Sequence, residues 1–98
     1  MARYRLTRAA DRDLERLFEY GIDRFGLDRA LDYVDGLKAR FQAVAENPSL
    51  YQSVDHIRPG YRRCVYGAHS LYYITGEDGV VIIRILGREH AQVVLPDG

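Results

Sequence analysis

Five arginines in the second half of the chain have the strongest potential for binding chemistry. Arg58, Arg62, Arg63, Arg84 and Arg88 lie in or beside segments with strand-like alternation, so a sheet could bring them to one surface. Arginine presents a planar fork of N–H donors that suits carboxylates and phosphates. Such a surface would bind RNA phosphates or the acidic side chains of a protein partner. The plainer interpretation is that these arginines are solvated charges that protect a sheet edge.

The other polar side chains form no known catalytic or metal-binding pattern. His56, His69 and His90 lack the spacing of metal ligands, and Cys64 is the only cysteine, so no metal site is expected. His90, within an Arg-Glu-His sequence, is the one candidate acid–base group, although a histidine in such a place is more often simply exposed. Without a glycine-rich phosphate loop or a nucleophile elbow, we predict no cofactor and no covalent catalysis.

A short strand and a first helix are predicted to begin the chain. Tyr4 and Leu6 alternate with arginines, which indicates a half-buried strand. Thr7 is the expected N-cap of a helix whose apolar stripe continues to Gly26, which ends it. The charged residues between the apolar positions, Asp13 among them, are expected on a solvated face.

A second helix is predicted to complete a helical hairpin. Asp28 is its expected cap, and Asn47-Pro48 ends it because proline lacks the N–H that a helix needs and restricts the residue before it. Two antiparallel helices with a short connection form such a hairpin, and its apolar faces require a partner layer. Residues 48–60 are expected to form a polar loop.

Three consecutive strands are predicted to supply that layer. They are expected at about 61–66, 69–75 and 80–87. Gly67-Ala68 and Glu77-Asp78-Gly79 are the natural turns between them. The run Val80-Val81-Ile82-Ile83 is apolar on both faces, which favours a central strand.

The composition indicates one domain over residues 1–98. Lys+Arg and Asp+Glu number 14 each, so the formal net charge is zero, which argues against a general nucleic-acid-binding protein. No apolar run approaches the length of a membrane span, and the N-terminus lacks the apolar core of a signal peptide. Together with the single cysteine, these features predict a cytoplasmic protein without a membrane partner.

Three segments, in this order, resemble ParE toxins of the ParE/RelE superfamily of type II toxin–antitoxin systems. LTRAADRDLERLFEYGIDRFG is similar to the family's first helix, and RPGYRRCVYGAHSLYYI and VVIIRILGREH are similar to its later strands. The resemblance covers about residues 3–95. It implies an α+β fold of β-α-α-β-β-β order, with the helical hairpin on one face of a twisted, mainly antiparallel sheet. It also implies a toxin that inhibits DNA gyrase and is neutralised by a ParD-type antitoxin.

The alternative is a RelE-like toxin that cleaves mRNA on the ribosome, since fold alone does not separate the two activities. The resemblance implies that such ribonucleases carry an arginine where this chain has Ser70 and a tyrosine near Val94. Arg88 matches part of their basic cluster, and some relatives use a terminal histidine, which His90 would supply. We therefore expect a gyrase inhibitor that is not an enzyme. A third hypothesis is a degenerate toxin that only binds its antitoxin.

Two sets of contact residues are predicted from this comparison. The antitoxin is expected to contact Tyr20, Tyr33, Arg58, Arg62, Arg63 and Arg84. The target is expected to contact the tail at Arg88, Glu89, His90, Val93, Val94 and Leu95. An amphipathic antitoxin helix would lie in an apolar groove, and an antitoxin strand would extend the sheet. No sequence-specific binding of nucleic acid is expected.

Overall fold

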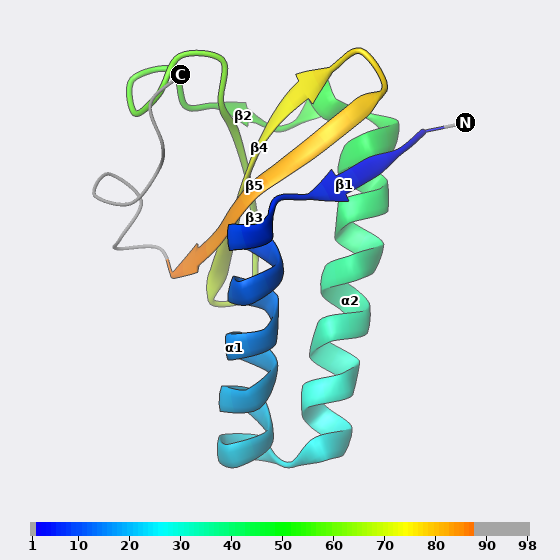
Figure 1. The fold of residues 1–98 in the computed structure, drawn as a ribbon, viewed down its shortest axis with the longest axis vertical. Coiled ribbons are helices and arrows are strands. Elements are labelled where there is room, and N and C mark those ends of the chain that lie inside the picture. Colours follow the sequence, from blue (N-terminus) through cyan, green and yellow to red (C-terminus); the bar gives the residue numbers. More distant parts are fainter. Residues whose placement is uncertain (1, 88–98) are drawn as a thin grey trace.

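Two layers, a helical hairpin and a five-stranded sheet, make up the computed structural model, which describes residues 2–87 (Figure 1). The elements are β1 (Tyr4–Leu6), α1 (Arg8–Phe25), α2 (Leu27–Glu46), a 3-10 turn (Pro48–Leu50), β2 (Gln52–Ser53), β3 (Arg62–Tyr66), β4 (His69–Gly76) and β5 (Gly79–Gly87). The predicted α+β fold is confirmed.

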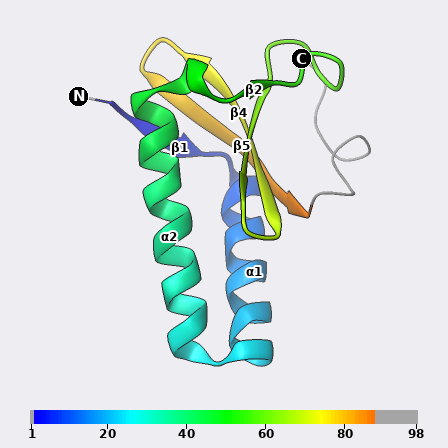
Figure 2. The same cartoon turned by 180° about the vertical axis from the view of Figure 1, so that it is seen from behind.

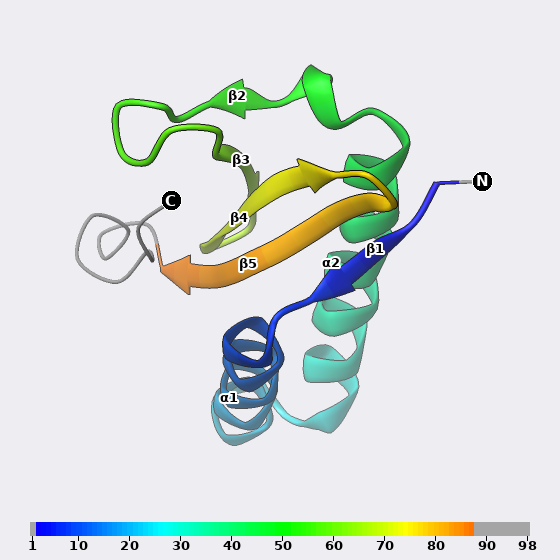
Figure 3. The ribbon, with the colours of Figure 1, turned by 45° about the horizontal axis from the view of Figure 1, so that its top comes forward.

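The strands lie in the order β1-β5-β4-β3-β2 (Figure 3). β1 is parallel to β5, and the other pairs are antiparallel. β5 therefore has a neighbour on each side, as its apolar sequence predicted. Tyr72 pairs with Arg84 and Tyr73 pairs with Ile82, so Ile83 is an extra residue in β5 and forms a β-bulge.

Thr7 joins the start of α1 to the sheet. Its hydroxyl oxygen accepts a hydrogen bond from the Ala10 N–H at 3.0 Å, which is the predicted N-cap. The same hydroxyl donates to the Ile83 carbonyl at 2.7 Å, and the Thr7 N–H donates to the Ile82 carbonyl at 3.1 Å. One side chain thus starts the helix and fixes its first turn against β5.

Gly26 connects the two helices without a loop. Its φ of 91° is a conformation that glycine adopts readily, and its N–H donates to the Ile22 carbonyl at 2.9 Å. The predicted cap at Asp28 is wrong, because α2 already begins at Leu27 and Gly26 is its N-cap. Asp28 instead lies in the first turn, where its charge complements the helix dipole. The predicted end of α2 at Asn47 is confirmed.

The segment 48–60, predicted as a polar loop, contains the 3-10 turn and β2. Gln52 pairs with Arg63 and Ser53 pairs with Arg62. Two residues are too few to produce an alternating apolar pattern, so the prediction missed this strand. The loop beyond β2 buries Val54 and Tyr61 against Tyr72, Ile83 and Leu86 on the sheet face opposite the helices. Both faces of the sheet are therefore covered.

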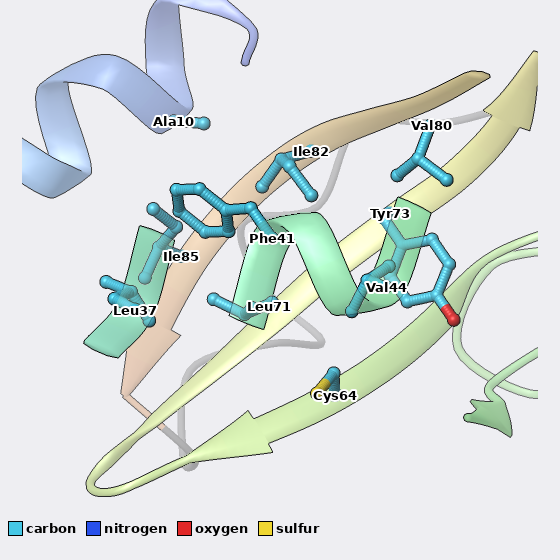
Figure 4. Close-up of a cluster of buried hydrophobic side chains, with 10 residues drawn as sticks. All are labelled: Ala10, Leu37, Phe41, Val44, Cys64, Leu71, Tyr73, Val80, Ile82 and Ile85. Atoms are coloured by element: carbon cyan, nitrogen blue, oxygen red, sulfur yellow. The ribbon is translucent and has the colours of Figure 1, made fainter. Parts of the chain in front are cut away.

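The main core lies between the hairpin and the sheet (Figure 4). Its buried residues are Ala10, Leu37, Phe41, Val44, Cys64, Leu71, Tyr73, Val80, Ile82 and Ile85. The Tyr73 hydroxyl donates to the Pro48 carbonyl at 2.6 Å, and burial raises the pKa of Tyr73 to about 12. Full burial of an apolar side chain such as Phe41 or Leu71 contributes about 1.5–3 kcal/mol relative to exposure.

The hairpin extends past the sheet. Figures 1 and 2 show that the last turns of α1 and the first turns of α2 lie beyond the strands. Large apolar side chains are exposed there: Tyr20 by 57%, Phe25 by 59%, Leu27 by 53% and Leu31 by 43%. A monomer rarely leaves such side chains gathered in solvent, so this uncovered end is the first place to look for a binding site.

Candidate protein-binding groove

The binding surface consists of two adjoining parts of about 490 and 390 Å³, which share Leu17, Tyr20 and His69 as lining residues. The larger part, called the apolar groove, is lined by Leu17, Tyr20, Gly21, Phe25, Arg29, Ala30, Tyr33, Ala68 and His69. A Cβ atom on Gly21 would lie 3.3 Å from the Ala30 Cβ, so small residues allow the helices to approach closely along it. Two helices with a furrow between them can accept the apolar ridge of a third helix.

The turn between β3 and β4 borders the apolar groove through Ala68 and His69. The Tyr33 hydroxyl fixes this turn: it donates to the Tyr66 carbonyl at 3.0 Å and accepts from the Ala68 N–H at 3.3 Å. Gly67 has a φ of 56°, and a Cβ there would lie 2.6 Å from the Tyr33 hydroxyl oxygen. Only glycine satisfies both requirements at this turn.

His69 completes the contact between this turn and α2. Its Nδ1 lies 2.8 Å from the Tyr33 hydroxyl oxygen. Because that hydroxyl gives its single proton to Tyr66, Nδ1 acts as the donor in this arrangement. Burial lowers the pKa of His69, and the Asp13 charge opposes this shift only in part. The imidazole is therefore mainly neutral at neutral pH.

The smaller part, called the polar pocket, shares Leu17, Tyr20 and His69 with the apolar groove. Its other lining residues are Asp13, Arg16, Arg84, Ile85, Leu86 and Gly87. A partner that fills the apolar groove would thus meet charged side chains at one end. The two parts form one surface with an apolar length and a polar end.

Asp13 is buried in the polar pocket, with 7% of its surface exposed, so its predicted solvated position is wrong. Arg84 donates to it through Nε at 2.7 Å and Nη2 at 2.8 Å, and the Ile85 N–H donates at 3.0 Å. β1 pairs with β5 only as far as Ile82, so α1 lies against the exposed edge beyond. The Asp13 carboxylate accepts the hydrogen bond that a neighbouring strand would otherwise accept from the Ile85 N–H, and it raises the pKa of Arg84.

The predicted antitoxin-contact residues fall into two groups. Tyr20, Tyr33 and Arg84 line the groove or the pocket. The others lie at the far end of the sheet near β2. There Arg58 donates to the Ile57 carbonyl at 2.9 Å, Arg62 to the Tyr51 carbonyl at 2.7 Å and Arg63 to the Gln52 side chain at 3.1 Å. The predicted target contacts, Arg88, Glu89, His90, Val93, Val94 and Leu95, lie outside the described residues.

The sequence-based prediction missed three arginines beside the groove. Arg16 lines the polar pocket, Arg29 lines the apolar groove, and the Arg24 guanidinium carbon lies 5.4 Å from the centre of the Tyr20 ring. A signal for two of them was present, because Arg16, Tyr20 and Arg24 recur every four residues on one helix.

Side chains from the helices occupy exposed strand edges. Arg40 donates to the Val65 carbonyl at 2.9 Å and contacts the Cys64 sulfur at 3.4 Å, beyond the end of the β2–β3 pairing. On β5, the Thr7 hydroxyl donates to the Ile83 carbonyl, and the Asp13 carboxylate accepts from the Ile85 N–H. A strand added beside these parts of β3 and β5 would have to displace these contacts. No helix within residues 2–87 has the length and apolar character needed to cross a membrane.

Comparison with known proteins agrees with this geometry. The family described as "ParE toxin of type II toxin-antitoxin system, parDE" matches residues 4–92. Toxin ParE1 of Caulobacter vibrioides is 41% identical over 86 residues, 88% of each chain. Toxin ParE1 of Mycobacterium tuberculosis is 38% identical over 86 residues, 87% of this chain and 88% of that toxin.

Among solved structures, a chain titled "Chromosomal ParDE TA system from P. aeruginosa" has the same fold. Its TM-score is 0.77 at 20% identity, and the match covers 91% of this chain and 98% of that chain. The family match spans nearly all of the sequence, and each of the two relatives is identical to this chain at more than a third of the aligned positions. The chain described here therefore belongs to the ParE toxin family of type II toxin–antitoxin systems.

Proposed function

We propose that this toxin binds and inhibits DNA gyrase in the cytoplasm, as a single domain without catalysis of its own, and that a ParD-type antitoxin neutralises it. The observation that supports antitoxin binding is the apolar groove, whose Tyr20 and Phe25 are more than half exposed. A surface of this kind is costly to leave in water unless a partner covers it. Family membership supports the gyrase target.

The shape of the site favours a helical antitoxin segment. Two helices already form the walls of the apolar groove, so a third helix can pack there with ordinary ridge-and-groove geometry. By contrast, Arg40, Asp13 and Thr7 occupy carbonyl or N–H groups of β3 and β5 beyond their pairing with β2 and β1, so a strand added at those two places would have to displace them. Of the two binding modes predicted from the sequence, we therefore favour the helix in the groove.

The described residues lend little support to ribonuclease activity. Ser70, at the position where the resemblance implied an arginine, is 0% exposed and its side chain cannot contact RNA. Arg84 is engaged by Asp13, and Arg62 and Arg63 hold the β2 segment. We propose the tail residues Arg88, Glu89, His90, Val93, Val94 and Leu95 as gyrase contacts on the basis of the family resemblance.

Synthesis rates after induction separate the candidate activities. The toxin would be induced in cells without antitoxin while DNA, RNA and protein synthesis are followed over time. We expect DNA synthesis to stop first, with an SOS response, because gyrase inhibition blocks replication. Protein synthesis that stops first, together with cut mRNA, would support the ribonuclease instead. Purified toxin in molar excess should also alter gyrase supercoiling or DNA cleavage, and unaffected gyrase would overturn the proposed target.

The groove is tested by antitoxin binding. The probe is a full-length ParD-type antitoxin that restores growth to cells expressing this toxin. Replacing Tyr20 and Phe25 together by alanine removes two exposed side chains from the groove wall, so folding should persist while antitoxin binding weakens by roughly 100-fold. Unchanged affinity of the double variant would show that the antitoxin binds elsewhere.

A further inference from the structure

We propose that the antitoxin helix in the apolar groove carries acidic side chains beside its apolar ridge, and that Arg16, Arg24 and Arg29 select it by charge. This inference rests on the proposed function, since it describes the partner of the same groove. It adds a rule for which antitoxins the toxin accepts. The rule follows from how charges are distributed around the groove.

The two charged rows of α1 differ in sign and in position. Residues four apart lie above one another on a helix, and successive rows are about 100° apart. One row is acidic throughout: Asp11, Glu15, Glu19 and Asp23. The next row is Arg12, Arg16, Tyr20 and Arg24. Only this second row contributes to the groove and the pocket, through Arg16 and Tyr20.

The facing helix adds a cation and no acid. Arg29 of α2 lines the apolar groove, whereas Asp28, Asp32 and Asp35 of the same helix do not line it. The one acid that lines the polar pocket is Asp13, whose charge is compensated by Arg84. The formal net charge of the whole chain is zero. The positive charge of Arg16, Arg24 and Arg29 beside the groove therefore results from the arrangement of charges, because the acids of both helices other than Asp13 line neither cavity.

These arginines are available to a partner. Within residues 2–87, Arg16, Arg24 and Arg29 form no ion pair, and all three are exposed. Arg24 lies over the Tyr20 ring, which places its charge at the groove wall. A cation beside an apolar surface attracts a carboxylate that approaches with the partner's apolar ridge, and it repels a lysine or arginine in the same place.

The required partner is thus an amphipathic helix with glutamate or aspartate beside its apolar ridge. Exposed charge pairs add modestly to affinity, but they speed association and exclude like-charged competitors. An antitoxin with basic flanks would meet Arg16 at the polar pocket and Arg29 in the apolar groove. The toxin would therefore discriminate between antitoxins of similar apolar pattern by the sign of their flanks.

Charge reversal tests this rule. The variant Arg16→Glu/Arg29→Glu would be compared with Arg8→Glu/Lys38→Glu, which makes the same change at two exposed helical positions that line neither cavity. Affinity for the protective antitoxin would be measured in about 0.05 M and 0.5 M NaCl, where screening differs strongly. At low salt we expect the groove variant to bind roughly 10- to 100-fold more weakly and the control to stay within about 3-fold. Changing flanking glutamates of the antitoxin to lysine should restore binding to the groove variant.

The outcomes separate this rule from the groove itself. If the groove variant binds within about 3-fold of wild type at low salt, the charge rule is wrong. If Tyr20→Ala/Phe25→Ala still loses binding in that case, the groove remains the antitoxin site and only its charge selection is rejected. If neither variant changes affinity, the proposed antitoxin site fails as well. Circular dichroism of each variant confirms that the exposed changes leave the fold intact.

Discussion

The two ends of the helical hairpin share one amphipathic pattern but have different surroundings. At the sheet end, Ala10, Leu37 and Phe41 are at most 1% exposed and form the core. At the free end, Tyr20 and Phe25 are more than half exposed and border the apolar groove. Apolar periodicity therefore does not tell whether a residue stabilises the fold or binds a partner. What decides this is whether the sheet reaches that part of the helix.

Asp13 and His69 mark the boundary between these two ends. Asp13 connects α1 to the last part of β5, and His69 connects the β3–β4 turn to α2. Both also line the polar pocket. Polar contacts therefore lie between the packed core at the sheet end and the groove at the free end. Substitutions can perturb the two ends separately.

The largest effect is expected at the sheet end, from Phe41→Ala. Phe41 is 1% exposed and packs with Tyr4 at a ring-centroid distance of 5.4 Å. Its loss should reduce the free energy of unfolding by about 3–5 kcal/mol, since a cavity remains where the ring was. Urea unfolding of the purified toxin measures this. A loss below about 1 kcal/mol would mean that the helical layer is not packed as described.

Asp13→Asn should have the next largest effect, because it removes the carboxylate charge that Arg84 and the Ile85 N–H contact at the boundary. We expect a loss of about 2–3 kcal/mol, less than for a fully buried pair since the Arg84 side chain is 19% exposed. The double variant Asp13→Leu/Arg84→Met should recover much of this loss, because it removes both charges together. The measurement is again urea unfolding, and equal stability of the single variant and wild type would show that the pair is dispensable.

Local patterns predicted most of the secondary structure, while tertiary contacts determined the rest. Thr7, Gly26 and Asn47 end or begin helices through their own chemistry, so each could be found in the sequence. The burial of Asp13 could not, because it depends on β1 ending before α1 crosses the edge of β5. The pairing of β2 depends likewise on where the following loop brings it.

The position of the groove could be predicted in part from the length of the helices and the width of the sheet. Tyr20 and Tyr33 were identified beside the helical stripes, but their position in the lining of the apolar groove was not. The 20-residue α2 is about 30 Å long at 1.5 Å per residue, whereas five strands about 4.8 Å apart span only about 20 Å. A helix of this length that crosses the strands extends past the sheet at one end, as Figure 1 shows for the hairpin. Arg16, Arg24 and Arg29 were missed because compensating acids near them in sequence lie on other faces.

Lowering the pH should reduce the free energy of unfolding by a smaller amount, through His69 at the boundary. Burial lowers the pKa of His69 in the folded protein, so the unfolded chain takes up the proton first as the pH falls. The stability that His69 contributes is therefore complete above its unfolded pKa of about 6.5 and declines as the pH falls below it. Urea unfolding at about pH 7.5 and pH 5.5 should show a decline in wild type that is smaller in His69→Gln. Equal declines in the two proteins would assign the effect to other groups.

Phe25→Ala should have the smallest effect on folding, and it completes the comparison with Phe41. The side chain is 59% exposed at the free end of α1, so its loss should change the free energy of unfolding by less than about 0.5 kcal/mol. The same substitution should weaken antitoxin binding, because the ring lines the apolar groove. Unfolding and antitoxin affinity, measured on both phenylalanine variants, would then separate the residues that stabilise the fold from those that bind. A large loss of stability from Phe25→Ala would remove that distinction, because the free end would then belong to the folded core.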